Sequence, residues 1–308
     1  MNERILITGS SGLVGTALAP ALASRGVDVL HFDVAARGAA HGDVRDKECV
    51  RKAVDGAHGI IHLAAVSRVI WGERDPELCR ATNVDGLRNV LEFASAAPLR
   101  PWVVFASSRE VYGQPDALPV DETCPVRPVN VYGRSKVEGE RLVEAARRDG
   151  MRACIIRLSN VFGSTNDHAD RVVPAFARGA AMGQTLRVDG ADHTFDFTHI
   201  DDVARGIVAL AELLSTGSAA PDPIHFVSGV PTTLGQLATM AIRIAGTAAN
   251  VCHAPPRNFD VAKFYGSFAR ANRILGWEPA VSLETGLSRL IHDFRNVQGS
   301  MQSEERAS

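Results

Sequence analysis

The amino-acid sequence predicts an α/β fold with a doubly wound parallel sheet and a smaller, mostly α-helical domain. Short, continuously apolar runs recur through the first half of the chain, and such runs are typical of parallel strands covered on both faces. Segments with helical spacing separate these runs, and an alternating strand–helix order predicts a parallel sheet. The chain has 308 residues and is 45% hydrophobic, which suffices for the large core that this fold requires.

The expected elements follow one another in a regular order. Each expected strand is a short apolar run, and each expected helix carries apolar residues three or four positions apart. The strands are expected at residues 4–8, 28–32, 59–63, 101–105 and 153–158, and the helices at 13–25, 46–55, 76–96 and 132–148.

A glycine-rich turn, TGSSGLVG, joins the first expected strand to the first helix and contains Gly9, Gly12 and Gly15. Glycines let the backbone approach a pyrophosphate closely, and a helix N-terminus offers it free N–H groups. Asp33 ends the second strand, 18 residues after Gly15. A carboxylate there binds ribose hydroxyls and repels a 2′-phosphate, so the pattern predicts a Rossmann-like site for NAD rather than NADP. Arg37 lies four residues further on and could instead serve NADP.

Other residues are expected to contact the cofactor. Asp43, in GDVRD, could meet the adenine amino group or could equally cap a helix. Ala64 and Ala65 follow the third strand, where small side chains would let the nucleotide pass closely. The remaining candidates for this site are Ser11, Leu13, Val14, Val44, Leu63, Asn83 and Ser107.

The alternation ends beyond about residue 165, where segments containing Gly and Pro, such as GVPTTLG and HAPPRNF, intervene. We expect a second domain there that closes over the strand ends, where such sheets bind ligands. The NAD-binding domain is assigned to residues 1–164 and about 196–230. The substrate-binding domain is assigned to about 165–195 and 231–298, and residues 299–308 to a polar tail.

Charge and cysteine content narrow the class of function. A formal net charge of −2 gives no electrostatic case for binding nucleic acid or an anionic membrane. No apolar run approaches the length that spans a bilayer. The five cysteines show neither paired nor metal-ligand spacing. We therefore expect a cytoplasmic protein without a metal site.

The segment VNVYGRSK places Tyr132 and Lys136 four residues apart, on one face of an expected helix. A tyrosine with a pKa of about 10 is a poor base near neutrality. A nearby ammonium group and an oxidised nicotinamide would stabilise its phenolate. Tyr132 could then accept a proton from a substrate hydroxyl while hydride leaves the same carbon. Ser108, at the end of the fourth strand, could hold the same oxygen.

These residues belong to a longer series of motifs. In order from residue 8 to 279 they are TGSSGLVG, Asp33, GDVRD, HLAA, TNVDG, SSREVYG, NVYGRSK, IRLSNVFG, FDFTHIDDVA and LGWEP. Over nearly its whole length, the chain resembles an extended short-chain dehydrogenase/reductase of the NAD-dependent epimerase/dehydratase family. The resemblance implies a catalytic set of Ser108, Tyr132 and Lys136, with Lys136 also holding the nicotinamide ribose.

The same resemblance implies a nucleotide-sugar substrate. Asn160 falls on an Asn that contacts the sugar nucleotide, and Arg257 on an Arg that binds the diphosphate. Relatives usually have Arg-Asp-Phe where this chain has Phe195-Asp196-Phe197, and that Arg grips a phosphate. Either Arg187 or Arg257 compensates, or the substrate lacks the usual diphosphate contact. The resemblance also implies a homodimer that pairs through residues 76–96 and 132–148.

Residues 109 and 110 bear on the reaction. Dehydratases of the family carry an Asp-Glu pair after the catalytic Ser or Thr, whereas this chain has Arg109-Glu110. Glu110 could abstract a proton beside a ketone, or could be a strand-end carboxylate bonded to backbone N–H groups. Arg109 could contact the substrate, but a side chain that points to solvent is the simpler expectation.

We therefore expect a nucleotide-sugar epimerase that oxidises carbon 4 transiently with tightly held NAD. The alternatives are a dehydratase or decarboxylase that uses Glu110, a sugar or sugar-acid dehydrogenase, and a non-catalytic NAD-binding scaffold. The intact Ser108, Tyr132 and Lys136 weigh against the scaffold.

Overall fold

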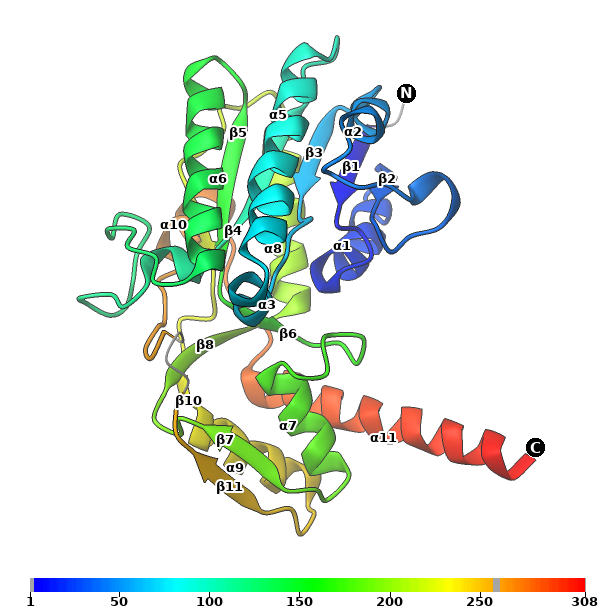
Figure 1. Cartoon of the computed structure of the whole chain (residues 1–308), viewed down its shortest axis with the longest axis vertical. Helices are drawn as coiled ribbons and strands as arrows, with labels where there is room; N and C mark the ends of the chain where they lie inside the picture. Colours follow the sequence, from blue (N-terminus) through cyan, green and yellow to red (C-terminus); the bar gives the residue numbers. More distant parts are fainter. Residues whose placement is uncertain (1–2, 257–260, 308) are drawn as a thin grey trace.

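The computed structural model describes residues 3–256 and 261–307 (Figure 1). Its largest sheet has six strands in the order β2-β1-β3-β4-β5-β9, and every neighbouring pair is parallel. This sheet confirms the predicted doubly wound α/β fold. The strand order reverses between β1 and β3, which leaves a crevice at their carboxyl ends. The strands are β1 (Arg4–Thr8), β2 (Asp28–Phe32), β3 (Gly59–His62), β4 (Trp102–Ser108), β5 (Ala153–Leu158) and β9 (Ile224–Phe226).

Helices cover both faces of the six-stranded sheet (Figure 1). On one face, α1 (Leu13–Ala23) packs beside α8 (Ile200–Ser215), and their side chains share a core with β1, β4 and β5. The other face is covered by α2 (Lys47–Val54), α5 (Gly86–Ala96) and α6 (Val131–Arg148). Burial on both faces explains why these strands read as continuous apolar runs.

A smaller part of the molecule, built from segments on either side of β9 in the sequence, lies beside the large sheet and has a hydrophobic core of its own (Figure 1). It combines two short sheets with three helices, so it contains more strand than the sequence suggested (Figure 1). Its elements are β6 (Asn160–Phe162), α7 (Val172–Ala181), β7 (Leu186–Asp189), β8 (Thr194–His199), β10 (Pro231–Thr233), α9 (Leu234–Ala245), β11 (Val251–Ala254) and α11 (Leu283–Ala307). Helix α11 continues through most of the segment expected to be a polar tail.

The helix expected at residues 76–96 is interrupted. It consists of α4 (Pro76–Arg80), a π-helical turn at Ala81–Asp85, and α5. The sequence analysis also missed α3 (Val69–Arg74), α10 (Ala269–Leu275) and two 3-10 turns, Gly38–Ala40 and Arg109–Tyr112. Short elements of this kind depend on contacts with distant residues rather than on local periodicity.

The segment that begins α8 is structural. His199 accepts a hydrogen bond from the backbone N–H of Asp201 at 3.2 Å and thereby caps the helix. The buried carboxylate of Asp202 accepts from the N–H groups of Ala280 and Val281. These contacts attach the C-terminal segment to α8. Within the described residues, no helix is long and apolar enough to cross a membrane.

Candidate active site

A cleft of about 810 Å³ opens at the carboxyl ends of β1 to β4 and continues toward the smaller part of the chain. It lies at the point where the strand order reverses, which is the usual ligand site of such sheets. The predicted residues that line it are Gly9, Gly12, Leu13, Val14, Gly15, Asp33, Asp43, Val44, Leu63, Ala64, Ala65, Ser107, Ser108, Arg109, Glu110, Tyr132, Lys136, Asn160 and Arg187.

The glycine turn forms a cradle that side chains would fill. Gly9 has φ +75°, and a Cβ atom there would lie 2.7 Å from the backbone nitrogen of Ala64. A Cβ on Gly15 would lie 2.5 Å from the carbonyl oxygen of Gly9. Both distances are shorter than real contacts, so this path requires glycine. Helix α1 begins at this turn without a side-chain cap, which leaves its first N–H groups for a pyrophosphate.

Asp33 is held at the edge of the cleft by two backbone groups. Its carboxylate accepts from the N–H of Ser11 at 2.9 Å and from that of Ala35 at 2.8 Å. This position and chemistry fit a carboxylate that binds ribose hydroxyls. Ser11 itself does not line the cleft and contributes by orienting Asp33.

Asp43 does not cap a helix, because Asp46 performs that role for α2. The Asp43 carboxylate instead forms hydrogen bonds with the guanidinium of Arg45, which hold the pKa of Asp43 below its ordinary value. Asp43 lines the cleft, so its position is compatible with the predicted contact to the adenine.

The structure brings the three predicted catalytic residues together. Ser108 ends β4, and its side chain lies close enough to the phenol of Tyr132, in the first turn of α6, to lower the pKa of that phenol. Nζ of Lys136 lies 5.8 Å from the centre of the Tyr132 ring and donates to the carbonyl of Ala106 at 2.7 Å. All three residues are buried and line the cleft.

Burial governs the titration of this set. Desolvation raises the pKa of Tyr132 to about 12, while the hydrogen bond with Ser108 and the charge of Arg171 oppose that rise. Desolvation also lowers the pKa of Lys136 to about 8. The phenolate is expected to be stabilised by Lys136 together with an oxidised nicotinamide, and the protein groups alone leave the pKa of Tyr132 above its ordinary value.

Arg109 is buried, which contradicts the expectation that it points to solvent. Its Nη2 lies 2.8 Å from Oε1 of Glu110, and its guanidinium lies 4.7 Å from the centre of the Phe195 ring. Oε2 of Glu110 accepts from the amide of Asn130 at 2.8 Å. Glu110 is therefore bonded to side chains rather than to backbone N–H groups, and each of its oxygens has a partner.

Asn83 and Ser107, both predicted to contact the cofactor, form hydrogen bonds with other protein groups instead. Asn83 does not line the cleft, because its amide is buried against the backbone of Val66 and the hydroxyl of Ser135. It thereby fixes the loop that follows β3. Ser107 lines the cleft, but its hydroxyl donates to Glu140 at 2.5 Å. These partners come from distant segments, so local sequence could not reveal them.

The candidate substrate residues differ in their placement. Asn160 lines the cleft and donates to the backbone carbonyl of Asp196 at 3.3 Å. Arg187 lies at the rim, 73% exposed, and pairs with Asp189 at 2.8 Å. Arg257 falls outside the described residues. At Phe195, the neighbouring cation is Arg109.

The sequence analysis missed a loop, residues 163–171, that forms one wall of the cleft. Arg171 acts electrostatically on Tyr132 and lies 3.7 Å from Asp167. Arg68 forms an ion pair with Asp170. These residues match no motif, and only the dense charge of NDHADR marked the segment.

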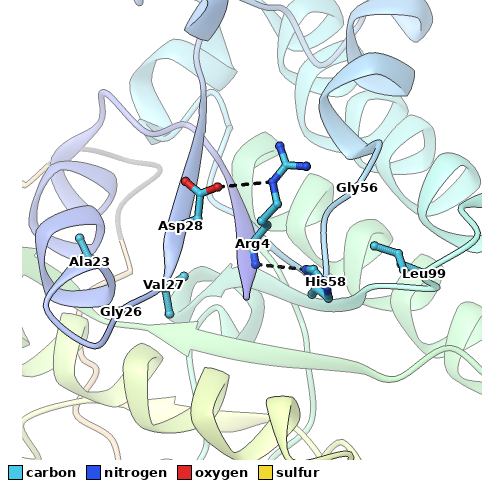
Figure 2. A pocket seen from close by; sticks show the side chains of 8 residues that line it. All are labelled: Arg4, Ala23, Gly26, Val27, Asp28, Gly56, His58 and Leu99. Atoms are coloured by element: carbon cyan, nitrogen blue, oxygen red, sulfur yellow. Dashed lines mark hydrogen bonds and ion pairs between the residues drawn. The ribbon is translucent and has the colours of Figure 1, made fainter. Parts of the chain in front are cut away.

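A second cavity, of about 790 Å³, lies near the amino ends of β1 and β2 (Figure 2). Arg4 lies 3.5 Å from Asp28, and its backbone N–H donates to Nδ1 of His58. None of the predicted site residues lines this cavity. It is therefore separate from the candidate active site.

A dinucleotide cradle beside a Ser–Tyr–Lys set defines a short-chain dehydrogenase/reductase type of enzyme. The model of the NAD-dependent epimerase/dehydratase family matches residues 5–223, and the chain belongs to this family. Its cofactor is NAD, in agreement with Asp33 and the glycine turn.

Named relatives span the whole chain. It is 29% identical over 314 residues to a UDP-glucose 4-epimerase of Mycolicibacterium smegmatis, covering 95% of this chain and 99% of that protein. A UDP-glucose 4-epimerase of Thermotoga maritima, solved with UDP-glucose, has a TM-score of 0.86 at 26% identity, covering 96% and 99%. The dTDP-glucose 4,6-dehydratase DesIV of Streptomyces venezuelae, solved with NAD, has a TM-score of 0.84 at 27% identity, covering 96% and 98%.

Proposed function

We propose that this protein is a nucleotide-sugar 4-epimerase that works through a transient 4-keto sugar. The observation that carries this proposal is the engagement of both carboxylate oxygens of Glu110, by Arg109 and by Asn130. A dehydratase or decarboxylase would need a carboxylate that can turn toward the substrate and exchange a proton with it, whereas the contacts with Arg109 and Asn130 hold this one in place. An epimerase needs only NAD, the Ser–Tyr–Lys set and room for the keto sugar. The relatives named as UDP-glucose 4-epimerases support the same choice.

The buried set can perform both halves of the reaction. Tyr132 accepts the proton of the sugar hydroxyl, and Ser108 holds that oxygen by a hydrogen bond. NAD held in the cleft would supply the hydride acceptor for the oxidation and the hydride donor for the return step, which must reach the opposite face of the keto sugar. Tyr132 then gives the proton back. Burial raises the pKa of Tyr132 and so disfavours the reactive phenolate. Positive charge near the phenol, such as that of Arg171, acts in the opposite direction and favours it.

We assign the sequence segments accordingly. Most of residues 1–164 and about 196–230 bind NAD, and residues about 165–195 and 231–298 bind the sugar nucleotide, with β6 and β8 near the boundaries paired in the smaller part. Within the cleft, Arg109, Asn160 and Arg187 are the described candidates for substrate contacts, and Lys136 for the nicotinamide ribose.

We also propose that the protein is a homodimer that works in the cytoplasm. Helices α5 and α6 occupy the region through which the resemblance places the dimer contact. All five cysteines are free thiols, which suits a reducing compartment. Sedimentation of the purified protein measures the dimer directly, and a monomer at micromolar concentration would contradict it.

Incubation with a panel of nucleotide sugars tests the proposed reaction. We expect a product of unchanged mass with inverted configuration at carbon 4, detected by mass spectrometry and NMR. Loss of water would indicate a dehydratase instead, and loss of carbon dioxide a decarboxylase. Net release of NADH would indicate a dehydrogenase. Denatured protein should release NAD, because an epimerase regenerates its cofactor in each cycle.

A further inference from the structure

Glu140 lies on the same face of α6 as the two candidate catalytic residues of that helix. Tyr132, Lys136 and Glu140 are spaced by four residues, so they follow one another by about one turn each. All three are buried toward β4. Each lies against one of three consecutive residues of that strand: Lys136 donates to the Ala106 carbonyl, Glu140 accepts from the Ser107 hydroxyl, and Tyr132 lies beside Ser108.

The Glu140 carboxylate joins α6 to two neighbouring strands. Its Oε1 accepts from the Ser107 hydroxyl at 2.5 Å and from Nε of Arg157 at 2.9 Å. Its Oε2 accepts from Nη2 of Arg157 at 2.7 Å. Ser107 belongs to β4 and Arg157 to β5. A two-pronged bond between carboxylate and guanidinium is directional, so it restricts both the rotation and the sliding of α6.

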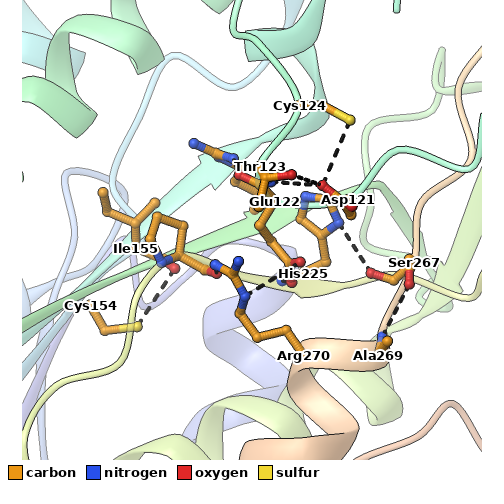
Figure 3. A network of polar contacts seen from close by, with 12 residues as sticks. Asp121, Glu122, Thr123, Cys124, Cys154, Ile155, His225, Ser267, Ala269 and Arg270 are labelled. Atoms are coloured by element: carbon orange, nitrogen blue, oxygen red, sulfur yellow. Dashed lines mark hydrogen bonds and ion pairs between the residues drawn. The ribbon is translucent and has the colours of Figure 1, made fainter. Parts of the chain in front are cut away.

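Arg157 is itself held in place. Its Nη1 donates to the phenol oxygen of Tyr112 at 2.6 Å and to the backbone carbonyl of Glu122 at 3.1 Å. Figure 3 shows the far end of this network, where the N–H of His225 donates to the Glu122 carboxylate and Arg270 lies 3.7 Å from it. The Tyr112 phenol also contacts His225 at 2.5 Å. The bond to Glu140 therefore extends from a braced side chain.

Glu140 also supplies negative charge near Lys136. Burial lowers the pKa of Lys136, while Glu140 and Cys79 act in the opposite direction. Burial raises the pKa of the Cys79 thiol, so that group is neutral near pH 7. The His62 imidazole on β3, whose pKa falls to about 3 through burial, and the Tyr132 phenol are neutral as well. Among these described groups, the Glu140 carboxylate is therefore the negative charge that favours the ammonium of Lys136.

We propose that Glu140 is a positioning residue of the active site. By fixing α6 against β4 and β5, it holds the phenol of Tyr132 and the ammonium of Lys136 beside Ser108. Buried ion pairs often stabilise a fold no better than apolar side chains of similar volume. Stability alone therefore does not explain the buried ion pair between Glu140 and Arg157. Its place on the catalytic face of α6, one turn beyond Lys136, suits a role in positioning that helix. The inference rests on the proposed function, because it takes Tyr132 and Lys136 to do the chemistry.

The variant Glu140→Gln tests this role, because it keeps the shape of the side chain and removes its charge. We expect kcat for epimerisation to fall roughly 10- to 100-fold, the range typical of a small misplacement of catalytic groups. KM should change less than about threefold, because Glu140 does not line the cleft. The alkaline limb of the kcat–pH profile should move to lower pH, because Lys136 then loses its proton more easily. Glu138→Gln, on the same helix and half-buried, should match the wild type.

A kcat within about threefold of wild type, with an unmoved alkaline limb, would overturn the role of Glu140. If Glu140→Gln does not fold, the double variant Glu140→Met/Arg157→Met decides, because it removes both buried charges. A folded double variant with low kcat supports the role, and one with wild-type kcat overturns it. Wild-type protein that converts no nucleotide sugar would contradict the proposed function and this inference with it.

Discussion

At the scale of single residues, environment separates Tyr132 from Glu110. Both side chains are buried in the same cleft. The Tyr132 phenol lies beside the Ser108 hydroxyl, whereas Glu110 is held on one side by Arg109 and on the other by Asn130. A proton acceptor needs a free lone pair directed at the substrate. The contacts therefore favour Tyr132 as the working base.

Two substitutions test whether Tyr132, and not Glu110, is the catalytic base. Tyr132→Phe should lower kcat by about 10²- to 10⁴-fold, the usual contribution of an acid–base group, while NAD binding stays unchanged. Glu110→Gln, which retains a carbonyl oxygen as acceptor, should keep kcat within about fivefold of wild type. Steady-state epimerisation assays and cofactor titrations provide both values. Loss of activity in a well-folded Glu110→Gln protein would instead make Glu110 a catalytic acid or base.

At the scale of elements, the glycine turn shows how a local pattern becomes a binding site. The turn passes so close to the loop after β3 that Gly9 would clash with Ala64 if it carried a side chain. Gly15, in the first turn of α1, packs directly on the backbone of Gly9 and Ser10. The position of α1 therefore depends on the absence of these Cβ atoms.

We expect Gly15→Ala to weaken NAD binding at least tenfold, because relief of a 2.5 Å contact must move α1 or the turn. Melting temperature should also fall. Thr16→Ala is a matched control on the same helix, because Thr16 is exposed and its hydroxyl donates only to backbone carbonyls, those of Gly12 and Leu13, among the described residues. Calorimetric titration with NAD measures the difference. Equal affinity in the two variants would contradict the close packing of the turn.

At the scale of the whole molecule, two contacts join the walls of the cleft. Arg68, which follows β3, forms a two-pronged ion pair with Asp170, which precedes α7. Next to it, the rings of Trp71 and His168 meet edge to face at 4.6 Å. Both contacts lie among the residues that line the cleft. The loop after β3 and the segment before α7 are therefore tied together beside the cleft.

Asp170→Asn should speed NAD dissociation several-fold, while it costs about 1 kcal/mol of stability, because the Asp170 carboxylate is largely exposed although Arg68 is not. The difference in dissociation rate between the variant and the wild type should diminish at high salt, because salt also weakens the Arg68–Asp170 ion pair of the wild type. Stopped-flow displacement of NAD measures the rate, and thermal denaturation measures the stability. An unchanged dissociation rate would show that this connection does not limit cofactor exchange.

Sequence alone determined the elements whose physics is local. The apolar runs, the glycine turn with Asp33, and the four-residue spacing of Tyr132 and Lys136 each follow from backbone geometry and side-chain periodicity. These features were sufficient to predict the sheet and to place Ser108, Tyr132 and Lys136 in one site. The match to the model of the epimerase/dehydratase family, over residues 5–223, covers the same features.

Tertiary structure decided the features that depend on partners distant in sequence. Arg109 is buried because Phe195, 86 positions further along the chain, supplies a surface for its guanidinium. Asn83 serves the loop after β3, and Ser107 serves Glu140, because packing brings those partners within hydrogen-bond distance. Burial, and not residue type, sets the pKa shifts of Tyr132 and Lys136. The sequence shows which ionisable and polar side chains are present. Their charge and their unused hydrogen-bonding capacity depend on the residues that the fold places around them.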